Sequence, residues 1–260
     1  MWRTIRIAVL LATLFLVGVS TWLDRHLTTS WQHTVWVGAF PVNADGSAAC
    51  AAYIGALEQS ELTPIAAFVA HEARRYGVQT AEPVNLQLYP PLERSPPTLP
   101  PRAGVLSRVL FVLRLRYYRW QTLHDLDRSR ARPQIVLFLL FHDPAHAVNL
   151  PHSLGLQRGL MGVVHLYADP RQSAQNAIVT AHELLHTFGA TDKYSPFSDA
   201  PLFPQGYADP ELEPLYPQYR AELMAGRMAL SATAQAMPET LQDVLIGPAS
   251  AREIGWIPGP

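Results

Sequence analysis

The chain has 260 residues, of which 20 are lysine or arginine and 21 are acidic, and its formal net charge is −1. This length suits one sizeable domain with an appendage, and the near-neutral charge argues against nucleic acid as a general partner. The single cysteine, Cys50, excludes an internal disulfide framework.

Residues 1–28 are predicted to lie outside the folded domain. Arg3 and Arg6 accompany an apolar run, Ile5–Leu23, whose 19 residues fall within the ~17–25 needed to span a bilayer. This pattern is typical of a secretory signal peptide or a signal anchor. Gly18–Ser20 could serve as a cleavage site, but the length of the run favours an uncleaved anchor. We therefore expect an exported, single-pass membrane protein with its domain outside the cytoplasm, in a bacterial periplasm, or a secreted protein if the signal is cleaved.

The folded domain, residues 29–260, is predicted to alternate strands and helices before an irregular C-terminal part. Period-two alternation of apolar residues predicts strands, and spacings of three and four predict helices. The expected elements before the C-terminal part are a strand at 34–40, helices at 47–57 and 63–77, a strand at 84–89, a helix within 102–132, and strands at 134–141 and 160–167. Six prolines within 90–101 predict an extended surface loop.

The segment 102–132 is chemically distinct because it holds eight arginines and only two acidic residues, Asp125 and Asp127. Its apolar residues recur at helical spacing and predict one apolar face. They are Leu106, Val109, Leu110, Leu113, Tyr117 and Trp120. Two interpretations remain open: a basic amphipathic surface that rests on anionic lipid, or a solvated face whose arginines pair with acids elsewhere. The second is favoured, because charge runs usually only solvate a surface.

The segment 134–141 is almost wholly apolar, as expected of a strand buried on both faces in a parallel sheet. A group of polar residues follows it, with one more histidine in the next expected strand. They are His142, Asp143, His146, His152 and His165. Such residues could be hydrogen-bonded loop residues or could hold a metal.

The segment 180–194 carries the strongest chemical signal in the chain. His182, Glu183 and His186 spell H-E-x-x-H, and residues four apart on a helix share one face, so both imidazoles can reach one ion. Glu183 would then lie beside that ion, where it can deprotonate a metal-bound water. The apolar flanks predict a buried helix, whose polar groups need partners.

The motif continues as His-x-x-Gly-x-x-Asp through Gly189 and Asp192. A glycine at a helix C-terminus adopts the left-handed conformation at little steric cost and turns the chain sharply. That turn can carry Asp192 back toward the two histidines as a third ligand. A later carboxylate, Glu222, is the alternative third ligand.

The extended pattern resembles the metzincin clan of zinc metallopeptidases, in the snapalysin-like form that ends in aspartate. The resemblance implies an α+β fold with a twisted mixed sheet, an active-site helix and a loop-rich C-terminal subdomain. It implies one catalytic Zn²⁺ held by His182, His186 and Asp192, with Glu183 as general base. It also implies a methionine turn below the metal, for which Met224 is the candidate and Met228 the second choice.

The resemblance raises three further expectations about the site. Tyr194 could donate a hydrogen bond to the oxyanion, although Tyr216 and Tyr219 are equally available. In related matrixins a structural zinc lies just before the active-site helix, so a second metal at His142, Asp143, His152 and His165 is considered. In metzincins an antiparallel edge strand lies above the zinc, and we expect the strand 160–167 to bind a peptide or protein substrate along such an edge.

The expected function is therefore zinc-dependent hydrolysis of peptide bonds. Two alternatives remain: a zinc amidase that acts on cell-wall peptides or other small amides, and a non-catalytic binding module stabilised by zinc. The intact Glu183 speaks against the last. Downstream, a helix is expected at 238–245, and a capping-box pattern at Ser250 and Glu253 predicts a short final helix.

Overall fold

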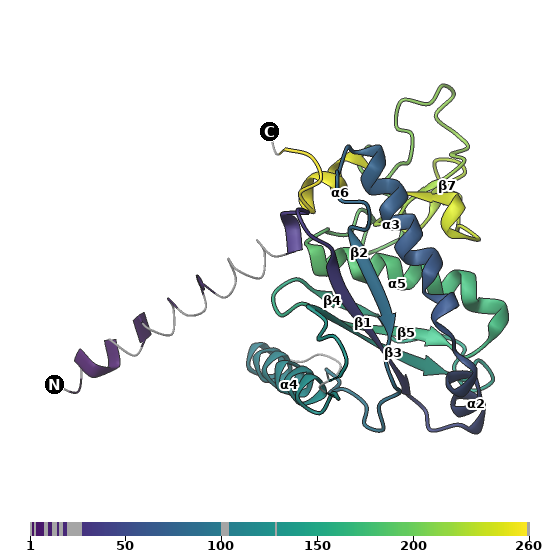
Figure 1. Ribbon diagram of the computed structural model, residues 1–260. Coiled ribbons are helices and arrows are strands. Elements are labelled where there is room, and N and C mark those ends of the chain that lie inside the picture. The colour runs from purple at the N-terminus through teal and green to yellow at the C-terminus, as the bar shows by residue number, and fades with distance from the viewer. Residues whose placement is uncertain are drawn as a thin grey trace.

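The computed structural model describes residues 28–99, 104–127 and 129–258, together with residues 2, 4–7, 10, 11, 15, 18 and 19. A five-stranded mixed sheet forms the centre of the domain (Figure 1), with the strand order β2-β1-β3-β5-β4. Its strands are β1 (Val35–Asn43), β2 (Val84–Leu88), β3 (Ile135–His142), β4 (Leu154–Leu156) and β5 (Met161–Tyr167). The first, second, third and fifth strands run parallel, and β4 alone pairs antiparallel, along β5.

Helices cover both faces of this sheet, so the described chain has an α+β fold. Figure 1 shows α3 and α5 on one side of the strands and α4 on the other. The helices are α2 (Ala48–Ala56), α3 (Thr63–Arg75), α4 (Val105–His124), α5 (Ser173–Phe188) and α6 (Pro248–Glu253). Short 3₁₀ turns lie at Gln59–Glu61, Pro170–Gln172 and Leu241–Asp243. The expected coarse fold class, with a mixed sheet, is confirmed.

The core is organised by the central strand β3, all of whose residues before His142 are buried. Ile135, Leu137, Leu139 and Phe141 contribute to the larger core cluster, which includes residues of α3 and α5. Val136, Phe138 and Leu140 point to the smaller cluster under α4. A strand flanked on both edges by parallel neighbours and covered on both faces has no solvated side, which explains its uninterrupted apolar sequence.

Helix α4 is the helix that the sequence analysis expects within residues 102–132. Its buried residues are Phe111, Leu115 and Thr122. The residues that form the expected apolar face are exposed. These are Leu106, Val109, Leu110, Leu113, Tyr117 and Trp120. Helix α4 thus carries apolar residues on two sides, and periodicity alone does not tell which side meets the core.

The chain after α5 is largely irregular, and its strands are short. They are β6 (Ala221–Glu222), β7 (Met228–Ala229), β8 (Gln235–Ala236) and β9 (Val244–Leu245). The predicted helix at 238–245 is wrong, because β9 pairs with β6 and draws the backbone into an extended path. The expected short final helix is present as α6, but the predicted capping box at Ser250 is wrong: α6 begins at Pro248, and the Ser250 hydroxyl donates to Glu222 Oε1 instead.

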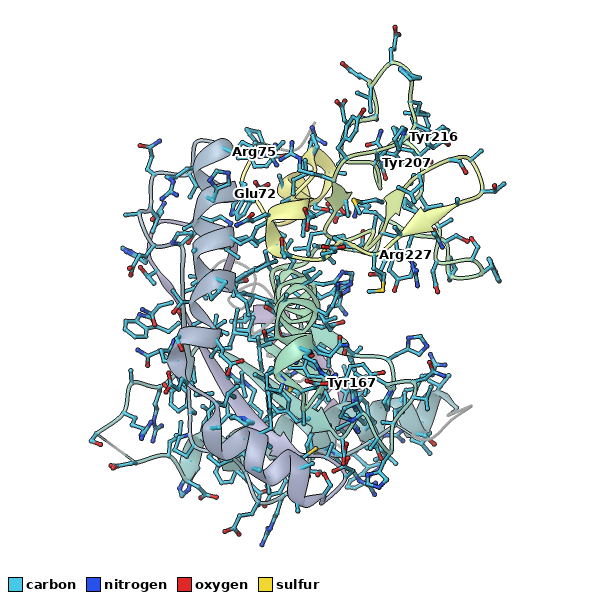
Figure 2. All side chains as sticks on the ribbon, turned by 90° about the vertical axis from the view of Figure 1, so that its right-hand side faces the viewer. Glu72, Arg75, Tyr167, Tyr207, Tyr216 and Arg227 are labelled. Atoms are coloured by element: carbon cyan, nitrogen blue, oxygen red, sulfur yellow. The ribbon has the colours of Figure 1, made fainter. Side chains whose placement is uncertain are left out.

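Hydrogen bonds between two side chains of α3 and the main chain of Ile246 attach this C-terminal part to α3. Figure 2 shows Glu72 and Arg75 on α3 beside the C-terminal segment. Glu72 Oε2 accepts a hydrogen bond from Ile246 N over 2.7 Å, and Arg75 donates to the carbonyl oxygen of the same residue. The segment that contains Ile246 is therefore attached to α3.

The expected membrane anchor within residues 1–28 is not supported. Among the residues that the structure describes, no helix combines the length and the apolar character that crossing a membrane requires. Residues 1, 3, 8, 9, 12–14, 16, 17 and 20–27 lie outside the described residues. The expected single-pass localisation is therefore corrected.

Candidate metal centre

Helix α5 carries His182, Glu183 and His186 and ends as the motif predicts. Its C-cap is Gly189, whose φ of 107° lies in the left-handed region. The N–H groups of Gly189 and Ala190 both donate to Leu185 O over 3.1 Å, which closes the last turn. The chain then doubles back, and Asp192 lies beside the histidines.

Three Lewis-base atoms converge at this turn. His182 Nε2 lies 3.1 Å from Asp192 Oδ1, His186 Nε2 lies 3.2 Å from the same oxygen, and the two Nε2 atoms are 3.0 Å apart. Among the described residues, these three form the one group of three or more His, Cys, Asp or Glu whose donor atoms lie within 4.8 Å of one another. The structure thus brings together the ligand set that the sequence predicts.

Main-chain carbonyls fix the orientation of both imidazoles. His182 Nδ1 lies 3.0 Å from Leu223 O, and His186 Nδ1 lies 2.8 Å from Ala190 O. A carbonyl only accepts, so each Nδ1 carries a proton, and in the neutral ring Nε2 then presents a lone pair. Two such lone pairs and a carboxylate oxygen that face one another are satisfied by a proton or by a metal ion between them. Such carbonyl partners are typical of histidines that bind metals.

The ionisation of the cluster also favours positive charge at its centre. Burial raises the pKa of the Asp192 carboxyl, but the hydrogen bonds to His182 and His186 outweigh it and hold that pKa well below its usual range. Burial lowers the pKa of His182, yet the hydrogen bond to Asp192 and the charge of Glu183 leave it above its ordinary value. A bound cation would satisfy the same carboxylate and imidazole groups.

Glu183 lies next to the cluster without joining it. Its side chain is buried, and Oε2 has no hydrogen-bond partner in the part of the chain that the structure describes. Burial raises the pKa of its carboxyl, and the His182 and His186 imidazoles lower it in part. A buried carboxylate oxygen without a partner is costly and calls for a proton, a water or a substrate group.

Met224, the candidate for the predicted methionine turn, lies in a turn that contacts α5. Met224 is fully buried, and its neighbour Leu223 supplies the carbonyl that accepts from His182 Nδ1. Met224 O accepts in turn from Lys193 N over 2.9 Å, so this turn is bonded both to α5 and to the loop that holds Asp192. Met228, the second choice, lies in β7 and is only half-buried.

Glu222, the alternative third ligand, is committed elsewhere. Its carboxylate is fully buried and accepts from Ala225 N, Gly247 N and the Ser250 hydroxyl at 2.7 to 3.1 Å. Burial raises the pKa of this carboxyl, and the bonds from Ser250 and Gly247 oppose that rise. Its carboxylate connects the turn around Met224 to α6 and is not available to the histidines, so Asp192 is the better candidate for a third ligand.

The loop around Asp192 is held by a contact that sequence reasoning missed. Both Glu253 oxygens accept from Thr191, one from its N–H and one from its hydroxyl, each over 2.8 Å. Lys193 Nζ donates to Glu253 and to Thr191. Both neighbours of Asp192 are therefore tied to α6. No local motif marks this contact, because Glu253 lies about sixty residues downstream.

Of the three tyrosines considered as oxyanion donors, Tyr194 is the one beside the cluster. Burial raises its pKa to about 12, and the charges of Asp192 and Glu183 contribute to that rise, so its hydroxyl keeps its proton. Tyr216 instead lies 3.1 Å from Tyr207, hydroxyl to hydroxyl, and Figure 2 shows both in the C-terminal part. Tyr219 is mostly exposed.

The structure does not gather the residues considered for a second metal. His142 Nε2 contacts His165 Nδ1 over 2.8 Å, whereas Asp143 Oδ2 pairs with His146 over 3.2 Å. His152 lies exposed in the same loop, and these residues do not form a group of three converging donors among those described. Two neighbouring imidazoles that share one hydrogen bond are satisfied without an ion.

The expected edge strand is also corrected. Strand β5 lies between β3 and β4, so the edge of the sheet near α5 is β4, which pairs antiparallel at Leu154, Gly155 and Leu156. A Cβ on Gly155 would stand 2.4 Å from Glu183 O and 2.5 Å from His186 Cβ. Glycine thus permits β4 to pass directly over helix α5. Three residues are too few for a recognisable strand pattern. Gly155 was the one residue in the sequence that could have indicated a close approach of the backbone.

Comparison with known proteins adds no further assignment. No protein-family model matches the chain, and no curated protein matches it significantly. The case for its chemistry therefore comes from the residues and their arrangement alone.

Proposed function

We propose that this chain is a zinc-dependent peptidase of metzincin type. The observation that carries the proposal is the convergence of His182 Nε2, His186 Nε2 and Asp192 Oδ1, with Glu183 beside them. Three protein ligands and an adjacent carboxylate are typical of catalytic zinc sites, whereas structural zinc sites are usually closed by four protein ligands.

The three donors suit zinc in chemistry and in spacing. Donors at ~2.0–2.1 Å from a tetrahedral ion stand ~3.3 Å apart, and the observed separations are 3.0, 3.1 and 3.2 Å. Two imidazoles and one carboxylate match the borderline-soft character of the ion. When bound, zinc would polarise a carbonyl and acidify a water molecule.

The roles of the surrounding residues follow from their positions. Glu183 takes the proton of the attacking water at Oε2 and delivers it to the amine that leaves. Its buried position and its unpartnered oxygen suit a group whose partner arrives with the substrate. Tyr194 donates its hydroxyl hydrogen to the carbonyl oxygen as charge develops there. Met224 supports the site from the core without touching substrate.

A peptide substrate would bind along β4. This short strand is the free edge of the sheet on the side of α5, and an extended peptide can add to such an edge through main-chain hydrogen bonds. The close approach of Gly155 to Glu183 and His186 would place that peptide beside the zinc ligands. Main-chain recognition suits a peptidase better than an enzyme specific for one small amide.

Metal content and casein digestion, measured on the same preparation, test the proposal. We expect one zinc per chain, cleavage of casein, loss of cleavage with a chelator and recovery with added Zn²⁺. His186→Ala should lose metal and activity, whereas His71→Ala, at an exposed position on α3, should lose neither. Zinc binding with cleavage of small amides only would instead indicate an amidase. Zinc binding without any hydrolysis would indicate a binding module.

A further inference from the structure

Helix α4 presents two apolar faces, only one of which is used by the fold. The inner face, at Phe111, Leu115 and Thr122, packs on the smaller core cluster. The apolar side chains of the outer face are 44 to 72% exposed; they are Leu106, Val109, Leu110, Leu113, Tyr117 and Trp120. At ~100° per residue these six centre on the direction opposite to the buried face. The helix therefore turns a continuous apolar stripe to the outside.

The composition of this stripe resembles that of helices that lie in a membrane interface. The rings of Tyr117 and Trp120 stack at 5.8 Å near one end of the stripe, and amphipathic aromatic residues favour the headgroup region. Leucine and valine supply the apolar remainder. Figure 1 shows α4 on the outer side of the sheet, away from α5 and the metal centre.

Arginines lie along both sides of the stripe. Helical geometry places Arg116 on one flank and Arg114 on the other, and both are exposed. Across residues 102–132 the sequence has eight arginines and two acidic residues, although the whole chain has a net charge of −1. The segment that contains α4 is thus strongly basic, and Arg114 and Arg116 flank the exposed apolar residues, which favours a negatively charged partner that also accepts apolar groups.

We infer that the outer face of α4 binds the surface of an anionic lipid bilayer. Leucine, valine and the aromatic rings enter the boundary between headgroups and acyl chains, and Arg114 and Arg116 contact lipid phosphates. A second copy of this chain is a poorer partner, because pairing two such faces sets arginine against arginine. The contact is peripheral: α4 already packs on the sheet through its inner face.

A fluorescent label at one position reports this contact locally. In the full chain, Leu113→Cys carries an environment-sensitive dye, and Cys50 is buried and therefore protected. Vesicles that contain phosphatidylglycerol should shift the emission to the blue, and vesicles of phosphatidylcholine alone should not. Val148→Cys, labelled at another exposed apolar position, is the control and should not shift. Because the dye is attached to α4, it reports lipid contact at α4 and not at another part of the chain.

Charge removal provides the second arm. The double variant Arg114→Gln with Arg116→Gln should weaken vesicle binding, as reported by the label at residue 113, by roughly 30-fold. A higher salt concentration should also weaken vesicle binding of the protein that keeps both arginines. Arg74→Gln with Arg220→Gln removes the same charge from exposed positions elsewhere and should leave binding unchanged.

Three outcomes would overturn the inference. One is that the emission of the label at residue 113 does not shift when anionic vesicles are added. Another is an equal shift at residue 148. The third is a shift without vesicles that grows with protein concentration, since it would show that a second copy covers the face. None depends on the metal centre, so this test and the test of the peptidase proposal can fail separately.

Discussion

Lys193 Nζ donates a hydrogen bond to Glu253 Oε2 over 2.8 Å and so joins the loop that carries Asp192 to helix α6. The Lys193 side chain is only 4% exposed, and a buried ammonium needs an anionic partner. The same carboxylate also accepts from Thr191. One side chain from the end of the chain therefore positions both neighbours of the third ligand.

Glu253→Gln should weaken zinc binding although Glu253 does not touch the metal. Glutamine can still accept from Thr191, but it leaves the Lys193 ammonium without a carboxylate, so the loop holding Asp192 loosens. Loss of such an outer contact typically costs roughly 10–100-fold in metal affinity. Competition with a chelator of known affinity measures this loss. Glu82→Gln makes the same change at an exposed site and should have no effect; equal affinities for the two variants would contradict the positioning role of Glu253.

The parts of the fold with clear periodicity were predictable from sequence. Strand β3 is apolar throughout because both its faces are buried, and α5 ends at Gly189 because a left-handed residue is needed there. Strand β4 could not be found, since three residues carry no pattern. The environment of the outward face of α4 could not be predicted, because helical spacing shows that a face is apolar, not what covers it.

The candidate site likewise has some residues that the sequence predicts and some contacts that it does not. His182, Glu183, His186 and Asp192 lie within eleven residues, so local geometry alone predicts their convergence. The carbonyls of Leu223 and Ala190, and the carboxylate of Glu253, act through main-chain position or through contacts far along the chain. Neither kind of contact leaves a motif, because almost any residue can supply a carbonyl.

Gly155→Ala should destabilise the protein and impair hydrolysis. The added methyl group would overlap Glu183 O and His186 Cβ, at 2.4 and 2.5 Å, so β4 must move away from α5. Overpacking of this kind costs about 1–3 kcal/mol. Denaturant unfolding measures the loss. Gly55→Ala, where a methyl group meets nothing within 4 Å, should instead be neutral or stabilising by up to about 1 kcal/mol. A Gly155→Ala protein as stable as the wild type would show that β4 does not pack as described.

Glu183→Gln should separate metal binding from catalysis. Glu183 is not one of the converging ligands, so the variant should retain one zinc per chain. It should lose about 10²–10⁴-fold in turnover, because an amide does not accept the proton of the water. Metal analysis and casein digestion on one sample check both parts. Full activity would exclude Glu183 as the base, and loss of zinc would make it a structural residue.

The stability of the protein should depend on pH through His165. Burial, together with the charge of His142, lowers the pKa of His165 to about 4, from an ordinary value of 6.5. The unfolded chain therefore takes up this proton first as the pH falls, so the contribution of His165 to stability is present above pH 6.5 and is lost toward pH 4.

His165→Gln should flatten this loss of stability between pH 6.5 and pH 4. Urea unfolding at several pH values measures it, with a chelator present throughout so that metal release does not contribute. His71→Gln on α3, at an exposed position, serves as the control and should leave the pH dependence unchanged. An unchanged slope in His165→Gln would mean that this imidazole titrates alike in the folded and unfolded chains.

The metzincin proposal depends most on Asp192 as the proposed third ligand. Asp192→Ala removes the oxygen that both histidines approach, so zinc affinity should fall sharply while the fold is retained, because this side chain is 42% exposed. Asp192→His should restore part of the affinity, since an imidazole is the other ligand used at this position of the motif. Chelator competition on the two variants gives the comparison. Wild-type affinity in Asp192→Ala would leave only the two histidines as supported ligands.

Glu222→Gln distinguishes a structural carboxylate from a ligand. Glu222 accepts from Ala225 N, Gly247 N and the Ser250 hydroxyl within the core, so its replacement should lower stability. Removing a buried charge that holds such bonds typically costs roughly 1–3 kcal/mol. At a temperature where the variant is folded, its zinc content should equal that of the wild type, because the carboxylate points to α6 and not to the histidines. Suppose that folded Glu222→Gln loses zinc while Asp192→Ala retains it. Glu222 would then be the third ligand, and the metzincin pattern would be replaced by H-E-x-x-H with a distant glutamate.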